Sequence, residues 1–345
     1  MRRHPTRRAA AALAVSALAL AALSACAAGS GTAPASAPTD AAADSAAADA
    51  AAGFPVTIEN CGSEVTLDSP AQRIVLVNND ELPNLEALGA VDRIVAVTSP
   101  LQPGLYADAT YSALEAQSVL STEKNATGGS VVSQESILGA EPDLVIAPEN
   151  AVDRAALTAS GIAVYTPSAY CADPGPELSG TATFDRVWSE VRTLGALLGE
   201  SGTAEQVVAD ATSTVGAVAP DGGTAAALYV SSGGSVLSPY GGPSMVTPVF
   251  AAAGLTNVYA DSGERVFDAN VEDIISRDPA TIVLLYSSGD PQSTVDSFLG
   301  APGVAGLSAV RDQRVIALPF AYTDPPSLLS VEGPAKLSGL LSALG

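Results

Sequence analysis

The stretch SQESILGAEPDLVI (residues 133–146) returns later in the chain as NVEDIISRDPATIV (residues 270–283). In both copies a polar residue is followed two positions later by glutamate, then by isoleucine, and finally by a proline that precedes an apolar run. Ser133 and Asn270 are good N-caps, so each copy predicts a short helix that leads through proline into a strand. The repeat indicates a duplicated architecture with one copy in each half.

Short apolar runs around both copies predict buried strands. The first series comprises residues 73–77, 94–97, 144–147 and 163–165, and the second comprises residues 225–230, 257–259, 282–286 and 315–318. Strands that alternate with helices in this way are typical of parallel sheets covered by helices on both faces. We expect an α/β fold of two lobes, each with one mainly parallel sheet.

The segment between the two strand series predicts a helical connector. Residues 184–198 are followed by a Gly-Glu-Ser-Gly break and then by residues 203–218, where apolar side chains recur at helical spacing. About 290 residues follow the start of the folded body at Phe54, which is long for a single core. The expected parts are an N-terminal lobe at 54–182, a connector at 183–220 with one long helix, and a C-terminal lobe at 221–345.

The N-terminus carries an export signal. Four arginines precede an apolar stretch from Ala9 to Leu23, which is shorter than the roughly 20 residues that span a bilayer as a helix. Leu23-Ser24-Ala25-Cys26 resembles a bacterial lipobox, in which the cysteine thiol is lipid-modified and becomes the new N-terminus. We expect a lipoprotein signal peptide at 1–25, lipidation of Cys26 and a disordered tether at 26–53. The body is then held at the outer face of the bacterial cytoplasmic membrane by acyl chains only.

Composition excludes several kinds of chemistry. The one histidine, His4, lies in the predicted signal peptide, so the exported chain has neither a histidine-activated nucleophile nor a histidine-based metal site. Without the four arginines of the signal, 11 of the 15 Lys and Arg residues remain against 37 Asp and Glu residues, and the formal charge changes from −22 to −26. Nucleic acid is therefore excluded as a partner, and direct docking of the body on anionic lipid is disfavoured.

Two cysteines remain after Cys26 is assigned to the lipid. Cys61 and Cys171 are a pair in an exported chain, which favours a disulfide between them. The alternative is two separate buried thiols, because a long intervening sequence says nothing about the distance between the two side chains.

Several motifs resemble those of one transport family. They are PAQRIV at 70–75, LEALGAVDRIV at 85–95, Glu135 with PDLVI at 142–146, and Glu272 with Pro279. Together with the lipobox and the inter-lobe helix, this ordered set is similar to the substrate-binding lipoproteins of iron-siderophore and cobalamin ABC importers, which have a helical backbone between their lobes. The resemblance covers the chain from about Phe54 to its end.

This resemblance implies a metal chelate held between two lobes, and a glutamate on each lobe that pairs with arginines of the permease. By matching motif, the permease-docking residues are Glu135 and Glu272. Taken singly, each glutamate is equally explained as an acid that complements the dipole of its own helix. Two glutamates at corresponding places favour a shared external contact.

Ligand-binding residues of such a receptor are expected on loops that follow the strands. In so acidic a protein, an anionic chelate needs a local positive charge. The expected residues are Tyr106, Asn150, Arg154, Tyr170, Tyr240, Arg265, Phe267, Tyr286 and Tyr322. The alternatives are ordinary surface salt bridges for the arginines and half-buried rings with hydroxyls in water for the tyrosines.

The expected function is capture of a ferric siderophore and its delivery to an ABC permease by a monomer that has no cofactor and is not an enzyme. A receptor for cobalamin, haem or another cofactor is the alternative within the family; Trp188, in the helical stretch before the connector, is expected to pack in the core. From other classes come a structural or signalling lipoprotein and an anchored carboxylate-based hydrolase. Such a hydrolase needs two paired Asp or Glu side chains about 5 to 10 Å apart around a cleft, whereas Glu135 and Glu272, on separate lobes, are expected to lie much farther apart.

Overall fold

A computed structural model of the chain describes residues 53–123, 129–215, 223–231 and 236–344. The predicted signal peptide, the lipidated Cys26 and nearly all of the predicted tether lie outside these residues. Within the described part, no helix combines the length and the apolar character that crossing a membrane requires.

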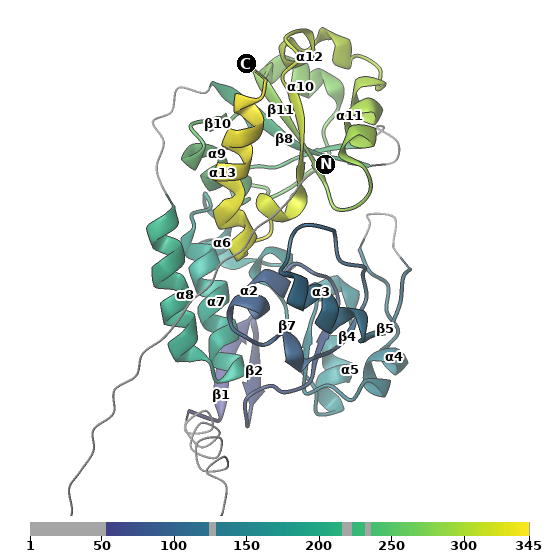
Figure 1. Cartoon of the computed structure of the whole chain (residues 1–345), viewed down its shortest axis with the longest axis vertical. Helices are drawn as coiled ribbons and strands as arrows, with labels where there is room; N and C mark the ends of the chain where they lie inside the picture. The colour runs from purple at the N-terminus through teal and green to yellow at the C-terminus, as the bar shows by residue number, and fades with distance from the viewer. Residues whose placement is uncertain (1–52, 124–128, 216–222, 232–235, 345) are drawn as a thin grey trace, which may run out of the picture. The chain divides into compact units, whose positions relative to one another are not determined.

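A five-stranded parallel sheet forms the centre of the first lobe (Figure 1). Its strand order is β5-β4-β3-β6-β7, and neighbouring strands all pair in parallel. The strands are β3 (Ile74–Leu76), β4 (Ile94–Val97), β5 (Ser118–Val119), β6 (Leu144–Ile146) and β7 (Ala163–Tyr165). The four strands expected here are confirmed, and β5 is an addition at the edge.

The second lobe is built on a sheet of the same kind. Strands β10, β8, β11 and β12 lie side by side in parallel, and β9 pairs with β8 in the antiparallel direction. The strands are β8 (Thr224–Ser231), β9 (Val236–Pro239), β10 (Thr256–Asn257), β11 (Thr281–Tyr286) and β12 (Val315–Pro319). The sheet is therefore mainly parallel, as expected.

The central strands of both sheets are buried on both faces, because alternate residues of these strands enter different cores. In β3, Ile74 and Leu76 pack into one cluster while Val75 packs into another. In β11, Ile282 and Leu284 face one cluster while Val283 and Leu285 face the other. This alternation explains why the strands read as continuous apolar runs.

Helices cover all four sheet faces. In the first lobe, one face is covered by α2 (Leu82–Ala87), α3 (Asp108–Glu115), α7 (Asp185–Leu198) and α8 (Ser201–Thr214), and the other by α4 (Gln134–Gly139) and α5 (Arg154–Ala159). In the second lobe, α9 (Val246–Ala252) and α13 (Leu328–Ser342) cover one face, and α10 (Val271–Arg277), α11 (Pro291–Leu299) and α12 (Ser308–Arg311) cover the other.

The connector contains two 14-residue helices rather than one long helix. Helix α7 ends because Gly199 adopts a left-handed conformation with φ of 72°, and α8 then packs back along α7. Helix α8 also contacts α13 of the second lobe. The expected helix at 203–218 ends earlier, at Thr214, and residues 216–218 lie outside the described part.

The repeat recognised in the sequence is also a structural repeat. The side chain of Ser133 accepts a hydrogen bond from the Ser136 N–H at the start of α4, and Asn270 does the same for Asp273 in α10. After each helix a non-glycine residue adopts a positive φ, 50° at Glu141 and 39° at Asp278. Each of these residues precedes the proline that leads into the central strand β6 or β11.

A β-hairpin that the sequence analysis did not predict precedes the first sheet. Strands β1 (Val56–Asn60) and β2 (Ser63–Leu67) pair in the antiparallel direction. Both turn residues, Cys61 and Gly62, have positive φ, as a tight hairpin turn of type I′ requires. Cys61 is joined by a disulfide to Cys171, with the two Cα atoms 5.2 Å apart.

Candidate ligand-binding site

A cavity of about 500 Å³ is lined by residues from both lobes. This volume lies within the range of small-molecule pockets. The first lobe contributes Glu149, Asn150, Ser168, Ala169, Tyr170, Cys171, Ala172, Pro174, Leu178 and Ser179, the connector contributes Arg186, and the second lobe contributes Pro243, Gly263, Glu264, Arg265 and Val266.

The topology of the first sheet explains which of its residues reach the cavity. Parallel strands end at the same edge of a sheet, and ligands of α/β proteins bind beyond the carboxyl ends of the strands. A short 3₁₀ helix follows β6 at Glu149–Ala151, and another follows β7 at Ser168–Tyr170. Both helices line the cavity, and the disulfide continues from the second one through Cys171.

Arg265 supplies a positive charge to the cavity from the second lobe. Its guanidinium forms an ion pair with Asp324, whose side chain is only 1% exposed. The second carboxylate oxygen of Asp324, Oδ1, accepts a hydrogen bond of 3.1 Å from the Met245 N–H. Burial lowers the pKa of the Arg265 guanidinium, but Asp324, Tyr170 and Tyr240 together raise it by more, so the net pKa is above its usual value. The cation is therefore held in place and permanently charged.

Tyr170 faces Arg265 from the first lobe. The Arg265 guanidinium carbon lies 5.3 Å from the centre of the Tyr170 ring, which is a cation–π distance. The Tyr170 hydroxyl donates a hydrogen bond to Asp80, and Asp80 accepts another of 2.7 Å from the Asn78 side-chain amide. Burial and the charge of Asp80 raise the pKa of Tyr170 well above its usual value, so the hydroxyl stays protonated and remains a donor.

Arg186, at the start of α7, lines the cavity but is committed to the backbone. Its Nη2 donates to the carbonyls of Leu178 at 2.7 Å and Gly180 at 2.8 Å, and its Nη1 donates to the carbonyl of Pro243. These bonds tie a first-lobe segment to a second-lobe loop. Burial lowers the pKa of Arg186, and the nearby Arg265 lowers it further, whereas Asp324 raises it.

The structure brings three of the nine predicted ligand residues to this cavity, namely Asn150, Tyr170 and Arg265. Tyr106 packs against the main cores of both lobes, and Tyr240 and Tyr322 are buried in the second lobe. Phe267 packs edge-on against Tyr259, with ring centres 5.7 Å apart, and Tyr286 ends β11. None of these five lines the cavity.

Arg154 lies elsewhere and holds the hairpin to the first sheet. Its Nη1 donates to the Asn60 carbonyl, and its Nη2 donates to the Asn60 side chain and to the Thr166 hydroxyl, all at 2.8 Å. It borders a separate space of about 170 Å³ beside β2 and β7. Its guanidinium is thus occupied by the protein in the described structure.

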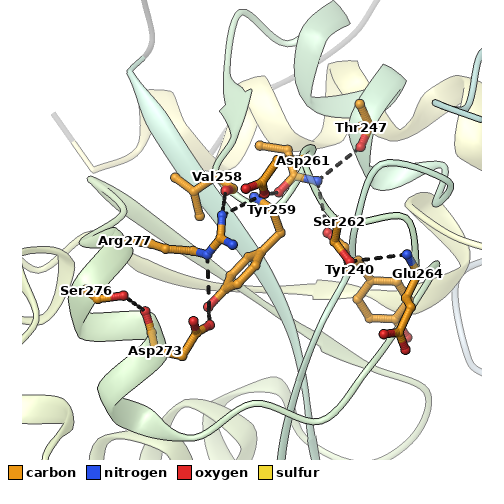
Figure 2. A network of polar contacts seen from close by, with 11 residues as sticks. Tyr240, Thr247, Val258, Tyr259, Asp261, Ser262, Glu264, Asp273, Ser276 and Arg277 are labelled. Carbon is orange, nitrogen blue, oxygen red and sulfur yellow. Dashed lines mark hydrogen bonds and ion pairs between the residues drawn. The ribbon is translucent and has the colours of Figure 1, made fainter.

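Glu135 and Glu272 are exposed on α4 and α10, and neither lines the cavity. Figure 2 shows the contacts that fix α10. The Tyr259 hydroxyl donates to Asp273 at 2.9 Å, and the Arg277 guanidinium lies 4.5 Å from the centre of the Tyr259 ring and pairs with Asp261 at 2.7 Å. Asp273 and Arg277 thereby anchor α10 to its own lobe.

In the part of the chain that the structure describes, no group of three or more His, Cys, Asp or Glu side chains is arranged to hold a metal ion. The cavity wall contains the guanidiniums of Arg186 and Arg265, the carboxylates of Glu149 and Glu264, and the Tyr170 phenol, which together suit a polar small molecule.

The sequence profile of the family described as periplasmic binding protein matches residues 74–322. A cobalamin-binding protein of Halobacterium salinarum is 27% identical over 300 residues, which cover 83% of this chain and 73% of that protein. The family match spans the two sheets and the connector.

Solved structures share the fold. An ABC-type Fe³⁺-hydroxamate transport protein from Saccharomonospora viridis is 37% identical, with a TM-score of 0.77 over 83% of this chain and 98% of that chain. The periplasmic vitamin B12-binding protein of Vibrio cholerae is 18% identical, with a TM-score of 0.54 over 80% of this chain and 98% of that one. A periplasmic haem-binding protein of Pseudomonas aeruginosa is 21% identical, with a TM-score of 0.58 over 79% and 92% of the two chains.

Proposed function

Because the chain belongs to the periplasmic binding protein family, we propose that it is the solute-binding protein of an ABC importer and captures a ferric siderophore of the hydroxamate class. The supporting observation is the cavity between the lobes, where the permanently charged Arg265 and the hydroxyl-bearing Tyr170 face the same space. Hydroxamate oxygens carry partial negative charge and accept hydrogen bonds, so the Arg265 guanidinium complements them, and the Tyr170 ring forms part of the same wall. The 37% identity to an Fe³⁺-hydroxamate transport protein favours the same class.

Delivery completes the proposed function. The protein binds and releases its ligand without chemistry, is a monomer, and stays at the outer face of the cytoplasmic membrane through acyl chains on Cys26. It hands the chelate to the permease through Glu135 on the first lobe and Glu272 on the second. Charged rim contacts of this kind orient a complex and speed encounter more than they tighten it.

Ligand titration with the purified protein tests the proposed substrate. The probes are a ferric trihydroxamate, a ferric tris-catecholate, haem and cobalamin, and the signal is quenching of Trp188 and tyrosine fluorescence with inner-filter correction. We expect saturable quenching by the ferric trihydroxamate and none by its metal-free form. The gallium trihydroxamate, which has the same charge and shape but quenches weakly, should compete with the ferric complex.

Matched arginine variants connect the titration to the cavity. R265Q should weaken binding of the ferric trihydroxamate at least tenfold. R192Q should not, because Arg192 pairs with Glu205 on an exposed face and does not line the cavity. Saturable quenching by cobalamin or haem only would show that the ligand is that compound and not a ferric siderophore. The similarity to the Halobacterium cobalamin-binding protein supports the cobalamin alternative. No binding by calorimetry with any probe would contradict the receptor function.

A further inference from the structure

Short helices α4 and α10 each expose an aliphatic side chain three residues after the conspicuous glutamate. Leu138 follows Glu135 and is 37% exposed, and Ile275 follows Glu272 and is 39% exposed. In the described residues, seven large apolar side chains are exposed, and these two occupy the same position of the structural repeat. An exposed aliphatic residue near a glutamate in one lobe could arise by chance. The same arrangement at the same position of the repeat in both lobes indicates a shared purpose.

The glutamate and the aliphatic residue of each pair lie on the same side of their helix. Positions three apart are neighbours on a helix surface, with Cβ atoms about 5–6 Å apart. One of the two residues between them, Ile137 in α4 or Ile274 in α10, is buried in the core of its lobe. This burial fixes which side of the helix faces outward. We call the first pair, Glu135 and Leu138, the α4 face and the second pair, Glu272 and Ile275, the α10 face.

The α4 face is held rigidly by contacts at both ends of its helix. Ser133 caps the first turn through the bond to Ser136, at 3.0 Å. At the other end, the Arg73 guanidinium donates to the carbonyls of Ala140 at 2.7 Å and Glu141 at 2.6 Å. The helix therefore keeps its position although it has only six residues.

The α10 face is held in an equivalent way. Asn270 caps the first turn through a bond of 2.8 Å to the Asp273 N–H. Beyond the last turn, the carboxylate of Asp278 accepts bonds from the Ser308 N–H at 3.0 Å and its hydroxyl at 2.8 Å. The Tyr259 and Arg277 contacts of Figure 2 add to these bonds and hold the helix in place. None of these bonds uses the side chain of Glu272.

An exposed carboxylate alone is a weak docking element, because exposed ion pairs are screened by water and salt. An aliphatic side chain beside it changes this situation, since its burial against a partner removes water from around the charge and strengthens the pair. Among the described residues, neither glutamate has an ion-pair partner.

We propose that Leu138 and Ile275 are contact residues for the permease, and that the permease offers each face a guanidinium beside an apolar recess. This inference rests on the proposed function, because it takes the partner to be the permease of the importer. The negative charge of the chain favours a basic partner surface, and the repeat requires two such surfaces, one for each lobe.

Transport in cells tests the two faces. A strain of the source bacterium that lacks this gene is complemented with the full chain or its variants, and the initial rate of uptake of a radiolabelled ferric trihydroxamate is measured. L138S and I275S should each lower the rate at least threefold, and the double variant at least tenfold. Ligand affinity of each purified variant should stay within twofold of that of the unchanged protein.

A matched control separates docking from general surface polarity. Leu340 is 36% exposed but lies on α13, which covers the opposite face of the second sheet from α10, so L340S should transport normally. Normal uptake by the L138S/I275S double variant, in cells where E135Q/E272Q lowers uptake, would overturn the proposal and leave a purely charged contact. If the unchanged protein itself fails to restore uptake, the proposed function fails, and the permease contact falls with it.

Discussion

The guanidinium of Arg265 stacks on the ring of Tyr170 across the boundary between the two lobes, at 5.3 Å from the ring centre. Each partner is held from behind by a carboxylate of its own lobe, Asp324 for Arg265 and Asp80 for Tyr170. The two side chains that best suit a polar ligand are thus positioned by acids that do not line the cavity.

Removing the charge of Asp324 should impair the site without touching the cavity wall. D324N places an amide donor against the Arg265 guanidinium and leaves a largely buried cation unpaired, which should cost about 2–3 kcal/mol of stability. Affinity for a ferric trihydroxamate should fall at least tenfold because Arg265 is no longer held. Urea unfolding and calorimetry measure the two effects. D261N breaks an exposed Arg–Asp pair and should leave the affinity unchanged.

The disulfide should stabilise the protein and organise the cavity wall. Cys61 and Cys171 are 110 residues apart, and in the loop-entropy model closure of such a loop contributes about 5 kcal/mol. C61S/C171S should therefore lower the free energy of unfolding by up to this amount. Because Cys171 directly follows Tyr170, ligand affinity should fall as well. Thermal unfolding with and without a reductant gives the same comparison on the unchanged chain; equal melting temperatures would contradict the prediction.

Stability should depend on pH through two buried glutamates. Burial raises the pKa of Glu81 well above its usual value, and the nearby Glu190 raises it further; burial also raises the pKa of Glu190. Above the ordinary glutamate pKa of about 4.3, the unfolded chain loses protons that the native protein keeps, so stability falls as pH rises toward the native pKa values.

The variant E81Q isolates this effect. Its amide oxygen can still accept the bond that Asn84 donates to Glu81 at 2.6 Å, while the ionisable group is gone. Near pH 7, E81Q should be more stable than the unchanged protein, and the difference should shrink toward pH 4. Urea unfolding at pH 4.5, 6 and 7.5 measures it. E115Q, at an exposed position of α3, should show no such trend.

The left-handed residue of the repeat should tolerate glycine. Glu141 has φ of 50°, a conformation that costs a side-chain-bearing residue about 1–2 kcal/mol. Its carbonyl receives the Arg73 bond, and E141G keeps that carbonyl. Because glycine also gains freedom in the unfolded chain, we expect a net gain of at most about 1 kcal/mol in urea unfolding. A loss of stability would show that the Glu141 side chain has a role not described above.

The sequence predicted the lobes well because their signals are local. The apolar runs, the Ser133 and Asn270 caps and the prolines after α4 and α10 each act within a few residues, and the duplication made them readable. Gly199, within the break seen in the sequence, ends α7 and divides the connector into two helices. The hairpin β1–β2 could have been recognised from its alternating residues and the Cys61-Gly62 turn.

The site was less predictable because it depends on contacts between distant segments. Arg154 is of the residue type expected to bind an anionic ligand, but its guanidinium donates a hydrogen bond to the carbonyl of Asn60, 94 positions earlier. Arg186 was missed because it belongs to an amphipathic helix, where a charged residue usually faces solvent. The available signal was that basic residues are rare in this acidic chain, so each arginine is a candidate for a specific role. Tyr106 and Tyr240 follow strands as expected but lie in packed cores.

Every residue that lines the cavity lies outside the twelve described strands. In the proposed function, substitutions and short insertions in these segments can therefore alter the choice of chelate while both hydrophobic cores and the α4 and α10 faces stay intact. Selection for the ligand and selection for contact with the permease would then act on separate parts of one gene. Descendants of such a receptor could bind different ligands and still deliver them to the same permease.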